Sequence, residues 1–322
     1  MIDLSNEFAI GIDIGGTNTK YGIVNHRGEI LEKGELKTDD YPKIDAYVDA
    51  LYDAVSLLIK QHADGGGVKG IGIGAPNGNF YTGTIEYAPN LQWEGIIPLT
   101  KLVTAKFGLP SALTNDANAA AVGEMNYGAA RGMRDFIMIT LGTGVGSGIV
   151  ANGQLILGHD GFAGELGHTI IRPGGRKHWS TSLDGSLEAY CSATGIVLTA
   201  KEMLENTKED SLLRKYSDKL DSKIVYECAV KGDKIAQDVY NFTGQILGEA
   251  LANFIMFSSP EAIVLFGGVI KAGDLIMKPT KEHMEKNLLP IFQNKVKLIF
   301  SELKEADAAI LGASALVWEI RE

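Results

Sequence analysis

Residues Phe8-Ala-Ile-Gly-Ile-Asp-Ile-Gly-Gly-Thr17 carry the pattern that decides the fold. A short apolar run stopped by two glycines is typical of a buried strand that ends in a tight turn. The pattern returns at Phe136-Ile-Met-Ile-Thr-Leu-Gly-Thr-Gly-Val145, and a Gly-Ile-Val triplet follows both segments. Coincidence between two glycine-rich β segments is one explanation. The other is a duplicated lobe, whose two hairpin turns face each other across a cleft and grip one triphosphate.

Strands and helices alternate along the rest of the chain. Apolar residues at spacings of three and four predict an amphipathic helix over 44–62. Strands are predicted over 20–25, 29–36, 69–75, 111–114, 136–141 and 262–266. Helical patterns cover 117–127, 195–258, 274–288 and 307–320. This alternation predicts the α/β class, and a chain of 322 residues is long enough to form two lobes.

Charge and cysteine content restrict the partners and the compartment. The formal charge of −10 disfavours nucleic acid and anionic membranes as partners. Two cysteines without a CxxC pair make no disulfide framework and indicate a reducing compartment. The first residues lack a basic signal-peptide region, and no apolar run approaches the ~18–20 residues of a membrane span. We therefore expect a cytoplasmic protein that does not bind membranes.

The glycines are numerous and unevenly distributed. The chain has 39 glycines, with twelve in residues 142–185 and only one in 201–243. Because glycine permits tight turns and close backbone approaches, the clusters at 70–78 and 142–185 predict where the backbone approaches a ligand.

Three glycine turns are candidates for nucleotide binding. In the first, backbone N–H groups and donor side chains can point at phosphate oxygens, and Asp13 is placed to hold Mg²⁺ through water. The residues of this turn are Gly15, Gly16, Thr17, Asn18 and Lys20. The second turn is Gly142, Thr143 and Gly144, and the third, Gly267 and Gly268, could admit an adenine or ribose. Neither a Walker loop nor an intact dinucleotide fingerprint is present, and a tight hairpin is the plain explanation of each turn taken singly.

Several polar residues are candidates for a second ligand. Asn115 and Asp116 precede a helix, so one of them can simply be its N-cap. Glu165 and His168 are three residues apart and would share one face of a helical turn, but they are too few ligands for a zinc site. By default, Glu188 is a solvated helix carboxylate and Asn90 a turn residue.

These residues occur in motifs that resemble the ROK family (repressors, open reading frames and kinases), particularly its glucokinase branch. The likeness runs from Phe8 nearly to the C-terminus. The motifs are Asp13-Ile-Gly-Gly-Thr17, Gly74-Ala-Pro-Asn-Gly78, Pro89-Asn-Leu-Gln-Trp93, Asn115-Asp-Ala-Asn118, Leu141-Gly-Thr-Gly144, Gly164-Glu-Leu-Gly-His168, Leu187-Glu188 and Phe266-Gly-Gly268. Each motif is weak alone, but eight in order are a strong signal.

The resemblance implies a two-lobed actin-like ATPase fold with a duplicated core and a central cleft. The expected lobes are 1–115 with 303–322, and 116–302. In the family, the aspartate at the position of Asp116 is the general base, and the residues matching Asn90, Asn115, Glu165, His168 and Glu188 bind sugar hydroxyls. ATP and Mg²⁺ are the expected cofactors, and a homodimer is the expected assembly.

The sequence departs from the family at a zinc motif, C-x-C-G-x-x-G-C-x-E, that many members carry before the sugar-binding glutamate. The three cysteine positions are Trp179, Thr181 and Ser186 here, and only His168 matches a zinc ligand. A structural zinc is therefore not expected. We expect packing and hydrogen bonds, involving His178 and Trp179, to hold the 174–186 loop.

The resemblance implies ATP-dependent phosphorylation of a hexose at its C6 hydroxyl, with glucose as the first candidate. Kinases of N-acetylmannosamine or N-acetylglucosamine are the alternatives within the class, and fructose is a third. A sugar-responsive repressor is the alternative from another class. Such members carry a DNA-binding helix-turn-helix before their first strand, and only seven residues precede Phe8 here, so we do not expect a repressor.

Overall fold

The computed structural model describes residues 7–62 and 67–319 of the chain. The strands are β1 Phe8–Ile14, β2 Asn18–Asn25, β3 Ile30–Lys37, β4 Val68–Gly74, β5 Gly78–Asn79, β6 Thr84–Glu86, β7 Ile96–Ile97, β8 Ser111–Thr114, β9 Phe136–Leu141, β10 Val145–Ala151, β11 Gln154–Leu155, β12 Ala262–Phe266 and β13 Lys297–Phe300. The α-helices are α1 Ile44–His62, α2 Leu99–Phe107, α3 Asp116–Tyr127, α4 Glu188–Cys191, α5 Ala193–Asn206, α6 Ser222–Val230, α7 Lys234–Ser258, α8 Asp274–Lys286 and α9 Glu305–Ala315. Short 3₁₀ helices are η2 Thr38–Asp40, η3 Leu166–His168, η4 Leu212–Lys219, η5 Gly268–Ala272 and η6 Leu316–Glu319.

Two five-stranded sheets repeat one strand order, which confirms the predicted α/β class and the internal similarity. The first sheet has the order β3-β2-β1-β4-β8 and the second β11-β10-β9-β12-β13. In the first, β1 pairs antiparallel with β2 and parallel with β4, and β4 pairs parallel with β8. In the second, β9, β12 and β13 are likewise parallel neighbours. The positions of the strands in the two orders match one to one, so the similarity is not a coincidence of glycine-rich sequence.

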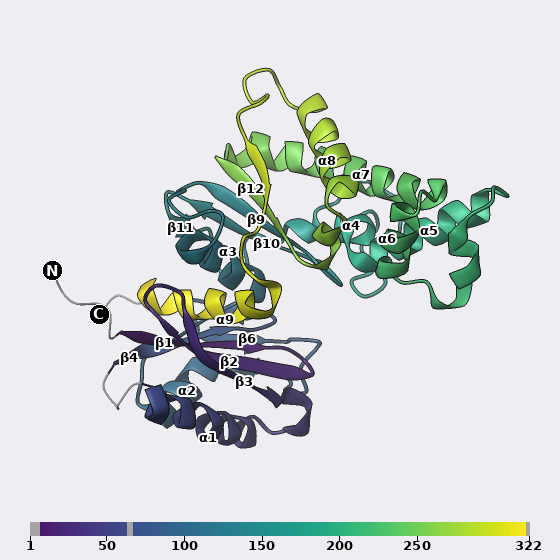
Figure 1. Ribbon diagram of the computed structural model, residues 1–322. Helices are drawn as coiled ribbons and strands as arrows, with labels where there is room; N and C mark the ends of the chain where they lie inside the picture. Colours follow the sequence, from purple (N-terminus) through teal and green to yellow (C-terminus); the bar gives the residue numbers. More distant parts are fainter. Residues whose placement is uncertain (1–6, 63–66, 320–322) are drawn as a thin grey trace. The chain divides into compact units, whose positions relative to one another are not determined.

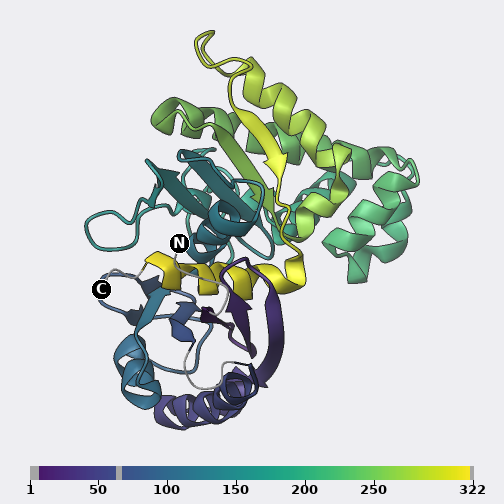
Figure 2. The ribbon, with the colours of Figure 1, turned by 60° about the vertical axis from the view of Figure 1, so that its left-hand side comes forward.

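The contacts divide the chain into two compact units. Unit 1 comprises the chain up to Arg134, Gly148–Gly164 and the chain from Ser301 onward, and unit 2 comprises Asp135–Ser147 and Glu165–Phe300. In unit 1, α1 and α2 lie on one face of the first sheet and α9 lies on the other (Figures 1 and 2). In unit 2, α7 and α8 run beside each other (Figure 1). The lobe boundaries expected from the resemblance stay a prediction.

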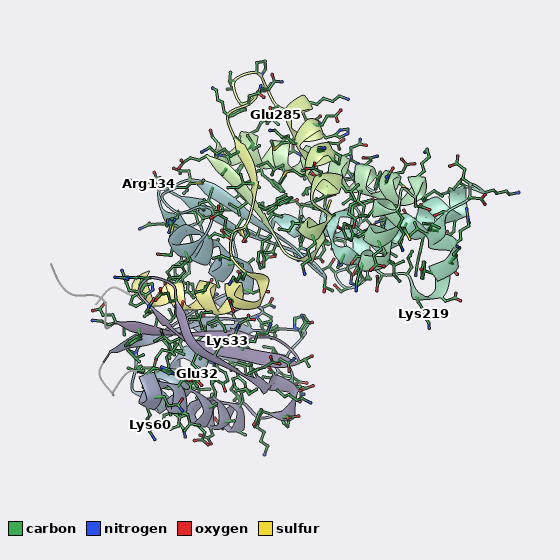
Figure 3. All side chains as sticks on the ribbon, in the orientation of Figure 1. Glu32, Lys33, Lys60, Arg134, Lys219 and Glu285 are labelled. Atoms are coloured by element: carbon green, nitrogen blue, oxygen red, sulfur yellow. The ribbon has the colours of Figure 1, made fainter. Side chains whose placement is uncertain are left out.

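The edge strand β3 is protected by charge. Its residues are all exposed or half-buried, and it carries Glu32 and Lys33, which Figure 3 labels. Charged side chains on an edge strand disfavour pairing with another chain. The other labelled residues, Lys60, Arg134, Lys219 and Glu285, also lie at the surface of the units that carry them (Figure 3).

Many glycines serve packing between chain segments, which corrects the expectation that they map ligand approach. A Cβ on Gly72 would lie 1.8 Å from the carbonyl oxygen of Ala313 in α9, and one on Gly11 would lie 2.1 Å from that of Ile310. Helices α3 and α9 also cross closely, since a Cβ on Gly123 would lie 2.8 Å from the Cα of Gly312. These glycines let α9 approach the first sheet and α3. Within the 70–78 cluster, Gly74 differs, because a Cβ there would make only ordinary contacts, 3.4 Å from Cβ of Ala119, 3.8 Å from Cα of Asp116 and 4.0 Å from Oδ1 of Asp13.

Candidate functional site

The first part of the candidate site lies in unit 1, where β1 ends. Asp13 is the next-to-last residue of β1 and pairs in register with Lys20 of β2 and Gly74 of β4. The pKa of Asp13 is raised to about 6, mainly by burial and also by the nearby charge of Asp116, while Lys20 opposes the rise. Asp13 and Asp116 therefore share one neighbourhood, as expected from the predicted site.

Asp116 and Asn115 sit at the start of α3. Asn115 is the N-cap, since its Oδ1 accepts a hydrogen bond of 2.7 Å from the backbone N–H of Asn118, so the capping explanation holds for this residue. Oδ1 of Asp116 accepts one from the N–H of Ala117 at 3.0 Å. Asp116 keeps solvent-accessible surface, yet the protein around its carboxyl raises the pKa of Asp116 by desolvation. An accessible carboxylate with a raised pKa is suited to accept a proton.

The turn from Gly15 to Asn18 is tight, and it contacts Asn90. The N–H of Gly15 donates to the carbonyl oxygen of Asn18 at 3.0 Å. A Cβ on Gly16 would lie 2.3 Å from the carbonyl oxygen of Asn90, so Gly16 admits the 88–92 turn. Thr17 and Asn18 are exposed at the tip of the turn. In unit 1, the structure thus brings together the predicted phosphate turn, Asp13, Asn90 and the start of α3.

The second part of the candidate site lies in unit 2, around two further glycine turns. A Cβ on Gly267 would lie 2.5 Å from the carbonyl oxygen of Leu141, so the Gly267-Gly268 turn lies beside the 142–144 turn. Nothing lies within 4 Å of a Cβ on Gly142 or Gly268. The Cβ side of both glycines is therefore open to a ligand, whereas the N–H of Gly142 donates to the carbonyl oxygen of Gly144 and its carbonyl oxygen accepts from the N–H of Ala193. Gly144 differs, because its Cβ would lie 2.4 Å from Oε2 of Glu188. The missing side chain of Gly144 thus makes room for the carboxylate of Glu188, one of the predicted sugar-binding residues.

Glu165, His168 and Glu188 also belong to this part. His168 Nε2 lies 3.7 Å from a carboxylate oxygen of Glu165, as the spacing of three predicts. Gly167 packs tightly against the carbonyl oxygen of Val145 and thereby holds η3 to the start of β10. The default expectation that Glu188 is a solvated helix carboxylate is wrong, because its side chain is only 12% exposed. Its Oε2 accepts a hydrogen bond of 2.7 Å from the N–H of Val145.

Hydrogen bonds and ring contacts hold the 174–186 loop, as predicted. His178 is buried, and its Nδ1 lies 3.1 Å from the backbone nitrogen of Thr181. The ring of Trp179 packs on that of His178 with centroids 3.8 Å apart. Arg176 donates to the carbonyl oxygens of Ala189 and Gly195. The guanidinium of Arg176 also lies 4.6 Å from the centre of the Tyr190 ring, a cation–π contact.

The residues present do not fit the zinc that many family members carry. No group of three or more His, Cys, Asp or Glu side chains within residues 7–62 and 67–319 is arranged to hold a metal ion. At the cysteine positions, Trp179 is 47% exposed, Thr181 engages His178, and Ser186 is buried. Nδ1 of His168, the one matching ligand, is buried without a hydrogen-bond partner.

Sequence reasoning missed two features of the site. Asn79 is buried, and its Nδ2 donates to Glu86 Oε1 and to the carbonyl oxygen of Asp160 at 3.1 and 2.8 Å. It anchors the loop that precedes Glu165, and no spacing rule identifies it. From the sequence, His178 was expected only to help hold the loop. The 2.6 Å approach of its Nε2 to Oε1 of Glu188 depends on tertiary structure.

Comparison with known proteins agrees with the geometry. The model of the ROK family matches residues 9–320. A glucokinase from Halalkalibacterium halodurans is 37% identical over 98% of this chain and 96% of its own length. A crystal structure of a ROK family glucokinase from Streptomyces griseus in complex with glucose and AMPPNP is 32% identical, with a TM-score of 0.77 over 97% of this chain and all of that one.

Repressors also occur among the relatives. A xylose repressor from Caldicellulosiruptor bescii is 29% identical over 96% of this chain and 77% of its own length. No helix within residues 7–62 and 67–319 combines the length and the apolar character needed to cross a membrane. The repeated sheets are those of the actin-like ATPase fold, as the resemblance predicts. This chain belongs to the ROK family.

Proposed function

We propose that this protein transfers the γ-phosphoryl group of ATP to the C6 hydroxyl of glucose. One observation carries the proposal: an accessible carboxylate with a raised pKa, Asp116, lies at the start of α3 near the half-buried Asp13. The similarity to glucokinases over nearly the whole chain supports glucose as the sugar.

Asp116 is the proposed general base. It accepts the proton of the C6 hydroxyl while that oxygen attacks the γ-phosphorus and ADP leaves. Asn90, Asn115, Glu165, His168 and Glu188 are the proposed sugar ligands. Carboxylates and amides suit adjacent hydroxyls, which both donate and accept hydrogen bonds. Because Asn115 Oδ1 is committed to the helix cap, its Nδ2 is the group left to donate to the sugar.

The proposed nucleotide ligands are the three glycine turns. Gly15 closes the first turn through its own N–H. The backbone N–H groups of Gly16, Thr17 and Asn18, with the Lys20 ammonium, would bind phosphate oxygens. The other two turns form a proposed binding surface for the nucleotide in unit 2, called here the nucleotide shelf. Its residues are Gly142, Thr143, Gly144, Gly267 and Gly268. The open Cβ sides of Gly142 and Gly268 support this role. Asp13 fits Mg²⁺, because a half-buried carboxylate with a raised pKa gains from a nearby cation. When bound, Mg²⁺ neutralises the charge of the triphosphate.

We further propose that the protein works in the cytoplasm as a homodimer that feeds glycolysis. The two cysteines, Cys191 and Cys228, are buried free thiols, which agrees with a reducing compartment.

A coupled assay of ADP release tests the function. Glucose, N-acetylglucosamine, N-acetylmannosamine and fructose are each supplied with ATP and Mg²⁺. We expect turnover with glucose to exceed that with the others. A preference for an N-acetylhexosamine would replace glucose within the same mechanism. Binding of sugar without turnover of any would support the repressor-like alternative and overturn the proposal.

The variant Asp116→Asn tests the assignment of the base. Because the amide keeps the shape but cannot accept the proton, kcat should fall by about 10²–10⁴-fold while KM for glucose changes little. Near-normal turnover of the variant would refute the role of Asp116.

A further inference from the structure

The hydrogen bonds of His178 determine where its proton lies. Nδ1 lies 3.1 Å from the backbone nitrogen of Thr181 and 3.0 Å from its hydroxyl oxygen. Because a backbone N–H can only donate, Nδ1 must be the acceptor and carry no proton. In the neutral ring the proton is therefore on Nε2, which makes Nε2 a donor.

The donor side of His178 faces Glu188. Nε2 lies 2.6 Å from Oε1 of Glu188, and both side chains are largely buried, at 1% and 12% exposure. The contact is short, yet Nε2 has no well-aligned hydrogen-bond partner in this structure. Hydrogen bonds of active sites are often poorly aligned without substrate and tighten when it binds.

Glu188 is thereby flanked on both oxygens. Oε2 accepts the N–H of Val145 at 2.7 Å, and Oε1 meets His178. Each oxygen of a carboxylate has further lone pairs, so the carboxylate can be fixed on both sides and still accept from a ligand. Such supporting contacts hold a binding group in one orientation.

The surroundings keep His178 neutral. Burial lowers the pKa of His178, and the neighbouring His168 lowers it further, while Glu188 opposes the shift. On the ring face, Trp179 packs with a centroid distance of 3.8 Å. A neutral ring has one donor and one acceptor, which matches the two contacts.

We propose that His178 is a positioning residue for the sugar site: its Nδ1 anchors the 180–181 turn, and its Nε2–H orients the carboxylate of Glu188. The His178 side chain thus links the loop to Glu188, a proposed ligand of the sugar. It does so without zinc, which the residues present do not fit. The inference rests on the proposed function, because it takes Glu188 as a sugar ligand.

Two substitutions separate the two ends of the ring. In His178→Asn, Oδ1 can take the place of Nδ1, but no group reaches Glu188. In His178→Gln, the Nε2 amide can donate to Glu188, but the acceptor for Thr181 is lost. We expect the Asn variant to keep its melting temperature and raise KM for glucose by about 10–100-fold, the usual range for such supporting contacts. The Gln variant should stay within about threefold of wild-type KM and melt at a lower temperature.

Controls distinguish positioning from general damage. His62→Gln alters a second close His–Glu contact, in which Nε2 lies 2.5 Å from Glu32 at the surface of unit 1, and should change neither KM nor melting temperature. In a Glu188→Gln background, His178→Asn should add little to KM, because the contact it removes acts through Glu188.

The outcomes separate this inference from the proposed function. If the wild-type chain phosphorylates glucose and the Asn and Gln variants raise KM equally, or neither raises it, His178 only braces the loop and the inference is wrong. If the wild-type chain phosphorylates no sugar, the proposed function falls, and this inference falls with it.

Discussion

At the scale of the residue, Asp13 carries a charge that opposes folding. Its pKa is raised from 3.8 to about 6, mainly by burial. The folded protein therefore holds this proton more tightly than the unfolded chain does, and ionisation destabilises the fold as pH rises from 4 to 6. One pKa unit corresponds to about 1.4 kcal/mol, so the cost at neutral pH is about 1–3 kcal/mol, and it vanishes below pH 3.8.

The variant Asp13→Asn should therefore be more stable than wild type at pH 8, by about 1–3 kcal/mol, and nearly inactive. The gain should be roughly halved at pH 5, where the wild-type carboxyl is mostly protonated in the folded state. Thermal melts of the ligand-free proteins at the two pH values measure the effect. A variant less stable than wild type at pH 8 would show that Asp13 makes favourable contacts that outweigh its burial.

At the scale of elements, glycines with similar sequence surroundings have different structural surroundings. Helix α9 packs directly against Gly72 in β4, whereas nothing lies within 4 Å of a Cβ on Gly142 after β9. Neither glycine has a left-handed backbone conformation. The sequence alone does not distinguish them, because both follow apolar β patterns.

A matched pair of substitutions tests this difference. Gly72→Ala places a methyl group 1.8 Å from the backbone oxygen of Ala313, so the free energy of unfolding should drop by about 1–3 kcal/mol or more. Gly142→Ala should melt like wild type but raise KM for ATP, roughly 5–150-fold if the methyl group costs a similar energy in the bound state. Denaturant unfolding and steady-state kinetics report the two effects. An unstable Gly142→Ala protein, or an unchanged KM for ATP, would contradict the nucleotide shelf.

The elements themselves were predictable where periodicity is strong. The helix over 44–62 and the strands over 136–141 and 262–266 are predicted with their exact bounds, because long or fully buried segments carry a clear apolar pattern. Helix α2 and strand β13 were not predicted. Helix α2 buries only Leu99 and Val103, and β13 has four residues and no fully buried one.

The candidate site was predictable in its residues but not in its contacts. Asp13, Asn115 and Glu165 lie in motifs that are contiguous in sequence. The approach of His178 to Glu188, and that of Gly16 to Asn90, joins segments that meet only in the folded chain. No local pattern encodes such pairs, so the structure was needed to assign them.

At the scale of the whole molecule, the two copies of one sheet order carry different side chains near their first turns. The turn after the first strand of one copy lies beside Asp13, and the corresponding turn of the other makes room for Glu188. The net charge of −10 gives no general attraction to anions. Any affinity for ATP must therefore come from the local donors of these turns and from Mg²⁺, whereas glucose, being neutral, is unaffected by the net charge.

Glucose should consequently stabilise the protein without nucleotide or metal. A ligand that binds only the folded state contributes RT ln(1 + [L]/Kd), or about 2.7 kcal/mol at 100 times Kd, which is a rise of about 5 °C in melting temperature for a chain of this size. Asp116→Asn should keep this rise, because it removes a proton acceptor and leaves the other sugar contacts, whereas His178→Asn should shrink it at the same glucose concentration. Melts with glucose, N-acetylglucosamine and no sugar, run with EDTA present, measure these shifts. A rise that requires ATP and Mg²⁺ would mean that the sugar residues are not arranged in the free protein, and that the nucleotide organises them.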